Sequence, residues 1–298
     1  MKFLKRHEIE DEKWNQCILQ SPNGLIYAIT WFLDQVAANW CAFVKEEEGN
    51  YTAVFPIPLK RKFGIKYVYP PFLVQQLGLF SPNYSTEKED RVISFLEQKF
   101  KFIELNLNYN SKQGEIRKNL VLQLNLEYPV IQNSFSKNHF RNLKKAEKSG
   151  LKIINNPKFS DIIFLFRSDR GSDLKKLSDE YYTCLLNLLQ KANSKNALIS
   201  LGVKYKTKII CGGIFMKYKN RITFIFSGNS KIGKDFGALF FLMNYIIKIY
   251  AKSGFILDFE GSENEGLSRF YSGFGASEEN YRFIKINNLP KVLKLFKK

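Results

Sequence analysis

The chain is poor in the residues that build metal and redox centres. It has two histidines, His7 and His139, and four widely separated cysteines that form no CxxC pair. Zinc sites of the usual kind need Cys and His ligands at short, regular spacings, so the sequence predicts no metal site. Isolated cysteines are typical of small buried apolar residues in a reduced protein rather than of a disulfide framework.

The sequence also lacks an obvious targeting or membrane-spanning segment. Its first residues, MKFLKRHEIEDEKW, have no apolar core of the kind that a signal peptide carries. The longest apolar run, residues 236–250, is interrupted by Asn244 and Lys248 and is too short to cross a bilayer. We therefore expect a cytoplasmic protein without a transmembrane segment.

Positive charge and aromatic side chains are abundant. Among the 298 residues, 46 Lys and Arg against 28 Asp and Glu give a net charge of +18, and 27 Phe and 15 Tyr suffice for a large core. Such a charge attracts polyanions: nucleic acid, nucleotide-linked substrates, coenzyme A or an anionic membrane. Because the lysines are spread along the chain, a merely solvated basic surface is an equal alternative.

Two distant segments share one order of predicted elements. WCAFVKEEEGNYTAVFPIPLKRKFGIKYVYPP begins at Trp40 and ALISLGVKYKTKIICGGIFMKYKNRITFIFSG at Ala197, and each predicts three strands separated by charged turns. A helix and a further strand are expected after each copy, at residues 85–100 and 103–108 and at residues 236–251 and 255–259. The pattern predicts an internal repeat. Two unrelated α/β stretches of similar rhythm are the alternative.

Three passages carry a resemblance to a known family: SKNHFRNLKKAEKSGLKI, ICGGIFMKYKNRITFIFSGNS and GFILDFEGSENEGLSRFYSGFGA. They resemble the GNAT superfamily, in particular the FemAB-like double-GNAT proteins. The N-terminal half matches in element order alone. The resemblance implies an α/β fold with mixed sheets, arranged as two tandem GNAT-like domains with splayed central sheets.

The expected domain boundaries follow from this resemblance. We expect an N-terminal GNAT-like domain at residues 1–133, a basic linking helix at 134–152 and a donor-binding C-terminal domain at 153–298. Within the last, residues 211–284 are expected to form one continuous splayed sheet with its helices. The closing strand of that sheet is expected at residues 279–287.

In the family's sheet two central parallel strands splay, the pantetheine arm pairs with an exposed strand edge, and amides at the start of the next helix bind the pyrophosphate. The matching loop here is SKIGKDFGA. The resemblance thus implies acyl-CoA binding by Lys231, Gly233, Lys234, Gly237 and Ala238. The match is partial, because Leu239 stands where the superfamily pattern has Gly or Ala. A helix that merely begins after a glycine loop is the alternative.

Three residues are predicted to be catalytic. Asp258 and Glu260 lie two apart at the end of a predicted strand, so both are expected to face one side of the sheet. Close carboxylates suit a general base that takes a proton from an amine. The alternative is that Asp258 caps the next turn and Glu260 pairs with a lysine. The resemblance makes Tyr271 a proton donor to the leaving thiolate, with simple packing as the alternative.

Substrate contacts are predicted at the end of the strand before the donor loop and on two helices. The residues are Ser227, Asn229, Arg269, Arg141 and Lys144. The last two belong to a positive stripe at i, i+4 spacing on the basic helix, which suits the phosphates of a nucleotide-linked substrate or of tRNA. A turn and a solvated helix face are the alternatives.

These features predict an N-acyltransferase that moves an acyl group, in the first place acetyl from acyl-CoA, to an amine of a small or cell-envelope precursor substrate. No permanently bound cofactor is expected, since acyl-CoA is a co-substrate. One alternative is an aminoacyl-tRNA-dependent aminoacyltransferase of peptidoglycan precursors. Family members that use tRNA often carry a long helical hairpin, and this sequence has no segment with the length or heptads for one. A non-catalytic polyanion-binding protein is the other alternative.

Overall fold

The computed structural model describes residues 1–62, 64–169, 178–261 and 264–290. Its contacts divide the chain into two compact units, unit 1 formed by Met1–Arg117 and Asn280–Lys298 and unit 2 by Lys118–Glu279. The expected boundaries at residues 133 and 152 do not coincide with this division. Residues 118–133 lie in unit 2, and residues 280–290 lie in unit 1.

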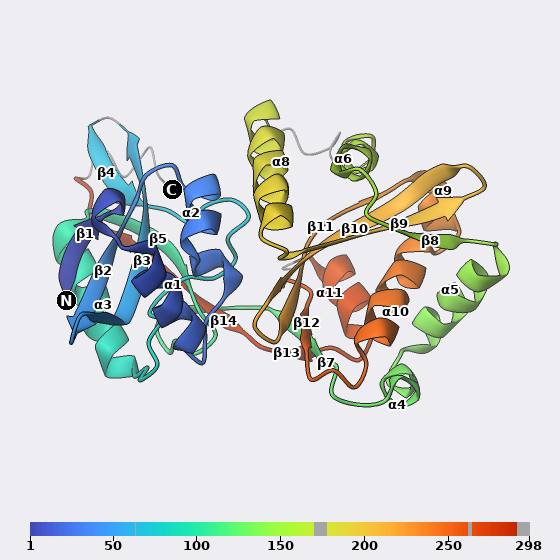
Figure 1. Cartoon of the computed structure of the whole chain (residues 1–298), viewed down its shortest axis with the longest axis horizontal. Coiled ribbons are helices and arrows are strands. Elements are labelled where there is room, and N and C mark those ends of the chain that lie inside the picture. Colours follow the sequence, from blue (N-terminus) through green and yellow to red (C-terminus); the bar gives the residue numbers. More distant parts are fainter. Residues whose placement is uncertain (63, 170–177, 262–263, 291–298) are drawn as a thin grey trace. The chain divides into compact units, whose positions relative to one another are not determined.

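Unit 1 is built on a mixed sheet with the strand order β1-β2-β3-β4-β5-β14-β6 (Figure 1). The strands are β1 (Lys2–Lys5), β2 (Trp40–Glu47), β3 (Asn50–Lys62), β4 (Ile65–Val68), β5 (Phe102–Leu107), β6 (Glu115–Arg117) and β14 (Tyr281–Asn287). Its helices are α1 (Asp11–Gln20), α2 (Thr30–Val36) and α3 (Thr86–Lys99), with 3-10 turns η1 (Arg6–Glu8) and η2 (Ile26–Ala28).

Unit 2 has a second mixed sheet, ordered β13-β7-β12-β11-β10-β9-β8. The strands are β7 (Leu120–Gln123), β8 (Lys152–Asn155), β9 (Leu198–Tyr205), β10 (Lys208–Tyr218), β11 (Arg221–Asn229), β12 (Ile256–Asp258) and β13 (Ser277–Glu278). The helices are α4 (Tyr128–Asn133), α5 (Lys137–Lys148), α6 (Phe159–Arg167), α8 (Asp179–Ser194), α9 (Lys231–Asp235), α10 (Ala238–Tyr250) and α11 (Glu265–Ser272). Among the described residues, no helix has both the length and the apolar composition needed to cross a bilayer.

The internal repeat is confirmed by the topology of the two sheets. In unit 1, β2, β3 and β4 pair antiparallel in turn, and β4 then pairs parallel with β5, which follows α3. In unit 2, β9, β10 and β11 pair antiparallel in the same way, and β11 pairs parallel with β12, which follows α10. Both copies therefore contain the strand–helix–strand crossover that creates a parallel pair in an otherwise antiparallel sheet.

Two strands pair with a sheet other than the one expected from their place in the sequence. The segment expected to close the C-terminal domain forms β14, which pairs antiparallel with β5 and β6 of unit 1. Conversely, β7 precedes the basic helix yet pairs antiparallel with β12 of unit 2. The predicted single run from residue 211 to residue 284 is therefore wrong for its last strand.

Helices cover both faces of the unit 2 sheet, and adjacent glycines of β10 mark where they approach. A Cβ on Gly212 would lie 2.5 Å from Ile162 of α6, and a Cβ on Gly213 would lie 3.0 Å from Leu242 of α10. Neighbouring residues of a strand point to opposite faces, so α6 and α10 lie on opposite sides of the sheet (Figure 1).

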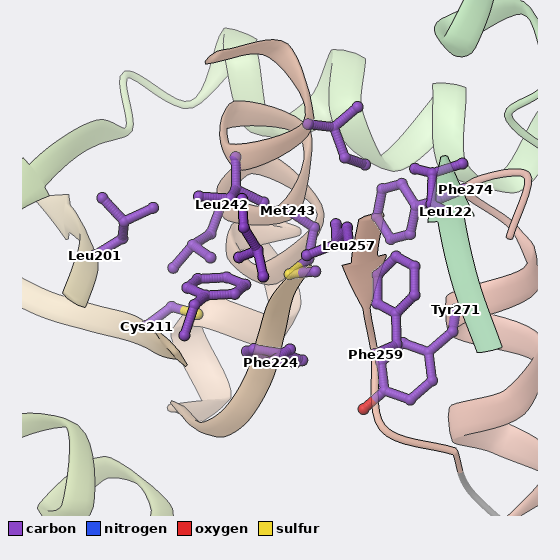
Figure 2. Close-up of a cluster of buried hydrophobic side chains, with 14 of the residues drawn as sticks. Leu122, Leu201, Cys211, Phe224, Leu242, Met243, Leu257, Phe259, Tyr271 and Phe274 are labelled. Atoms are coloured by element: carbon purple, nitrogen blue, oxygen red, sulfur yellow. The ribbon is translucent and has the colours of Figure 1, made fainter. Parts of the chain in front are cut away.

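The core on the α10 side is dominated by aliphatic and aromatic side chains (Figure 2). Met243, from the middle of α10, is fully buried. Phe259 stacks on Tyr271 at a centroid distance of 5.0 Å, and Phe135 meets Phe274 edge-on at 5.2 Å. Burial of each such side chain contributes about 1.5–3 kcal/mol, which fixes α10 and α11 against the sheet.

His139 fastens the basic helix α5 to α11. Its Nε2 lies 2.7 Å from the carbonyl oxygen of Phe270, and its Nδ1 lies 2.8 Å from Oγ of Ser136. A carbonyl accepts only, so Nε2 carries the hydrogen and Nδ1 accepts from the Ser136 hydroxyl. Ser136 is also the N-cap of α5, since its Oγ accepts from the amide of His139.

The tight fit of β14 against unit 1 gives a first prediction. Gly114 has φ +94°, and a Cβ there would lie 2.3 Å from the carbonyl oxygen of Phe283 in β14. Gly114→Ala should destabilise the protein by about 3 kcal/mol or more in urea unfolding. Gly49→Ala is the matched control, because Gly49 has φ +78° with open space around it and should cost about 1–2 kcal/mol. Equal costs for the two variants would contradict the β14 docking.

The burial of His139 predicts a dependence of stability on pH. Burial lowers the pKa of His139, opposed by its hydrogen bond to Phe270. Below about pH 6.5 the unfolded chain takes up a proton that the folded protein does not, so stability is present above that pH and is lost as the pH falls towards the folded pKa. Between pH 7 and pH 5 the wild type should therefore lose more stability than His139→Gln. His7→Gln, which alters an exposed histidine, should follow the wild type; a wild-type slope shared by His139→Gln would refute the assignment.

Candidate functional site

The two central strands of unit 2 part soon after they begin. The parallel ladder joins Arg221, Ile222 and Thr223 of β11 to residues 256–258 of β12 and ends there. Beyond Thr223, β11 continues to Asn229 with β10 on one side, and no described strand pairs with its other edge. The expected splay is therefore present, and it leaves an open strand edge.

A pocket of about 360 Å³ lies at this splay and is referred to here as the splay pocket. Four structural elements contribute to its wall. They are the end of β11 with Ser227 and Asn229, the α9–α10 segment with Lys234 of α9 and Gly237, Leu239 and Phe240 at the start of α10, the helix α11 with Gly266, Leu267, Phe270 and Tyr271, and the end of α6 with Phe166 and Asp169. Most of these side chains are apolar, and the volume is in the range of small-ligand sites.

The first turn of α10 faces this pocket. Gly237, the N-cap, has φ +71° and ψ +30°, and it offers no side chain to the free amides of the helix start. A Cβ at Gly237 would also lie 2.9 Å from the carbonyl oxygen of Asn142 in α5, so glycine is required by the backbone and by packing. The free amides and the helix dipole favour an anion at this point.

The segment expected as a donor-binding loop is not a loop throughout. Residues Lys231–Asp235 form the short helix α9, capped by Ser230, whose Oγ accepts from the amide of Gly233. A Cβ on Gly233 would lie 2.2 Å from Oδ1 of Asn229, so this glycine permits a close approach within the fold. Of the five predicted CoA-binding residues, Lys234 and Gly237 line the splay pocket, while Lys231, Gly233 and Ala238 do not.

Asp258 does not take the position expected of a general base. It is fully buried, and its Oδ2 accepts a 2.6 Å hydrogen bond from the guanidinium of Arg221. Its Oδ1 accepts from the amide of Glu260, so Asp258 caps the following turn, as the alternative interpretation had it. Both carboxylate oxygens of Asp258 accept hydrogen bonds, and Asp258 does not line the splay pocket. Its contacts are therefore structural.

Arg221 joins two carboxylates in this buried group. Its other nitrogen lies 2.8 Å from Glu279, which follows β13. Burial raises the pKa of Glu279, and the charge of Arg221 opposes that rise. Burial alone would lower the pKa of Arg221, but the charges of Asp258 and Glu279 raise it overall. The three residues thus tie the start of β11 to β12 and to the segment after β13.

Glu260 does not continue the strand that contains Asp258. Strand β12 ends at Asp258, and Glu260 has φ +51°, so the two side chains are not arranged as alternate residues of one strand. Glu260 is absent from the splay pocket, and its charge instead acts on Tyr181 of α8. The expected pair of carboxylates facing one side is therefore wrong.

Tyr271 is the predicted catalytic residue that does reach the pocket. It lines the splay pocket and is 8% exposed. Its ring stacks on Phe259 and meets Phe224 edge-on, while its hydroxyl lies at the margin of the cluster in Figure 2. These ring contacts hold Tyr271 in the wall of the splay pocket.

The predicted substrate-binding residues divide into two groups. Ser227 and Asn229 line the splay pocket. Arg141, Lys144 and Arg269 are exposed and line none of the described pockets of unit 2; Arg141 donates to Asn138 of its own helix. The geometry thus brings Ser227, Asn229 and Tyr271 together and leaves the three cations outside.

Sequence reasoning missed the part of the site that comes from α6. Asp169, just beyond the end of α6, lines the splay pocket and pairs with Lys234. Phe166 lines it as well and packs on Phe226 at a centroid distance of 4.8 Å. No local motif marks these residues, because only the packing of α6 on β10 and β11 places them here.

The fold resembles several solved structures. The crystal structure of FemX is similar over 100% of both chains, with a TM-score of 0.71 and 12% sequence identity. L-PGS from Bacillus licheniformis has a TM-score of 0.55 at 12% identity, covering 96% of this chain and 95% of its own. A tandem GNAT protein from the clavulanic acid biosynthesis pathway has a TM-score of 0.53 at 8% identity, covering 97% and 99%. No family model matches the sequence, and no curated protein is significantly similar to it.

At these identities the likeness is one of fold. The chain has the fold seen in FemX and in the tandem GNAT protein, with two mixed seven-stranded sheets. This confirms the fold class that the sequence predicts.

The buried pairing of Asp258 with Arg221 predicts that a substitution of Asp258 lowers the stability of the protein. Asp258→Asn removes the charge that compensates buried Arg221 and should destabilise the protein by about 3–5 kcal/mol. Glu265→Gln, in an exposed residue at the start of α11, should change stability by less than about 0.5 kcal/mol. Urea unfolding of both variants measures the difference. An Asp258→Asn variant as stable as the wild type would contradict the structural role.

Proposed function

We propose that the protein is an acyltransferase that binds an acyl-CoA thioester in the splay pocket of unit 2 and transfers its acyl group to an amine. The observation that carries the proposal is the open edge of β11 beyond Thr223, beside a pocket that also receives the start of α10. The double-GNAT fold supports it at the level of class.

The pocket offers complementary contacts to a thioester donor with an amide-containing arm and a pyrophosphate. Free backbone groups on the open edge of β11 can pair with the amides of the arm, as in strand addition. The amides at the start of α10 and the ammonium of Lys234 suit the phosphates, although Asp169 partly neutralises that lysine. Leu267 and Phe270 of α11 give the acyl end an apolar wall.

Transfer by this site needs positioning and two proton movements. The amine nitrogen attacks the thioester carbonyl carbon, the C–N bond forms and the C–S bond breaks, and the sulfur leaves as a thiolate. The hydroxyl of Tyr271 gives that thiolate a proton. The amine loses its proton to solvent, because Asp258 does not line the pocket and Asp169 is paired with Lys234, the residue placed at the phosphates. Holding donor and amine together supplies much of the rate.

Aminoacyl transfer from tRNA is the second candidate. It is favoured by the net charge of +18 and by the exposed cations of α5, which include Arg141 and Lys144. Phosphate contacts of this kind make binding strongly dependent on salt. The apolar splay pocket favours the CoA thioester instead. The acceptor amine is that of a small or cell-envelope precursor in either case.

The proposal predicts separate effects on binding and on chemistry. Ser227→Phe fills the splay pocket and should weaken binding of CoA by more than about tenfold in calorimetry. Ser194→Phe, at an exposed position of α8, should leave the affinity for CoA unchanged.

Tyr271→Phe should lower kcat for thiol release from acetyl-CoA about 100-fold, with KM little changed, because one proton donor is lost.

The assay uses acetyl-CoA with a panel of primary amines. A wild-type protein that binds neither acetyl-CoA nor CoA, but consumes aminoacyl-tRNA, would replace the proposal with the second candidate. Full activity in Tyr271→Phe would remove the hydroxyl from the mechanism and leave it a packing residue.

A further inference from the structure

Unit 1 contains a pocket of about 590 Å³ that the proposed transfer does not use. It is lined by β1 and η1, by the start of β2 and the two residues before it, by the strands β3 and β4, and by α3 and the residue that follows it. The lining residues are Phe3, Lys5, Arg6, His7, Ala38, Asn39, Trp40, Cys41, Leu59, Lys60, Arg61, Lys66, Lys99 and Phe100. It is called the basic pocket here, because six of these residues are Lys or Arg and none is Asp or Glu.

Among the described residues, most of the cations in the basic pocket have no carboxylate partner. Arg6 is the exception, since it lies 2.7 Å from Asp34 and 2.8 Å from Asp11. In the part of the chain that the structure describes, no ion pair involves the other five, which are Lys5, Lys60, Arg61, Lys66 and Lys99. Their like charges repel one another across the pocket, so an anion placed between them is stabilised.

Aromatic faces hold several of these cations in place. Lys99 Nζ lies 3.9 Å from the ring centroid of Phe3, and Lys60 Nζ lies 4.3 Å from that of Tyr69. The guanidinium of Arg6 lies 5.2 Å from the ring of Trp40. Cation–π contacts orient a charge without neutralising it, so the pocket stays positive.

Two lysines from different elements lie close enough to Cys41, a buried residue of the pocket wall, for their charges to act on its thiol. Burial raises the pKa of Cys41 to about 12, and the charges of Lys99 and Lys66 both act against that rise. Lys99 ends α3 and Lys66 belongs to β4, so cations from distant parts of the sequence act on one point.

We propose that the basic pocket binds a small soluble ligand that carries two or more linked phosphates. Several lysines can each contact a different phosphate oxygen, and the guanidinium of Arg61 can bind one in a forked, two-bond geometry. The volume is that of a small-molecule site, and the cations line a hollow rather than a stripe along the surface, which favours a diphosphate or triphosphate over a nucleic-acid strand. The inference does not depend on the acyltransferase proposal, because all of its residues lie in unit 1.

The test is calorimetric titration of the full-length protein with pyrophosphate, tripolyphosphate and ADP at about 50 and 200 mM salt. Tripolyphosphate should bind more tightly than pyrophosphate and more weakly at the higher salt. Lys66→Glu and Arg61→Glu should each weaken tripolyphosphate binding by about tenfold or more. Lys112→Glu makes the same change in charge at an exposed position of unit 1 outside the pocket and should alter affinity by less than about twofold.

Three results would overturn the proposal. The first is that none of the three phosphates binds. The second is that Lys66→Glu and Lys112→Glu lose the same amount of affinity for tripolyphosphate. The third is that a mixed tRNA pool binds, and Lys66→Glu weakens that binding, while the small phosphates do not bind. Lys66→Gln serves as a second, milder variant, and equal melting temperatures of the variants exclude misfolding as the cause of a loss.

Discussion

The buried ion pairs of Arg221 with Asp258 and Glu279 are the contact on which the unit 2 site depends. They fasten β11 to β12 where the parallel ladder is short, and the strands part immediately beyond it. A charge group of this kind is weak evidence for extra stability, since its desolvation offsets much of its attraction. Its effect here is geometric: it keeps the closed end of the two strands together while the other end stays open.

Much of the fold was predictable because local signals and the repeat agree. Ser85 and Ser136 mark the starts of α3 and α5, and both side chains accept from backbone amides as N-caps do. The order of strands, charged turns and helix recurs in both units, and the sheets confirm it. Within the site, Ser227, Asn229, Lys234, Gly237 and Tyr271 were predicted and do line one pocket.

The errors arise where distant packing decides. The order of elements does not say that β14 pairs with β5 and β7 with β12, because edge pairing depends on the completed sheets. Asp258 has the sequence context of a base at a strand end, yet the arginine that engages it begins another strand, 37 residues earlier in the sequence. Asp169 had no sequence signal at all, since the packing of α6 alone brings it to the pocket.

Hydrogen exchange of the backbone amides in β11 is the most direct test of the central claim, that a thioester donor occupies the splay beside the open strand edge. Saturating CoA should slow exchange selectively in residues 224–229 and in the first turn of α10, because these amides become bonded or covered by the donor. Protection at neither segment, at a CoA concentration that saturates the protein, would contradict the account and place the donor elsewhere.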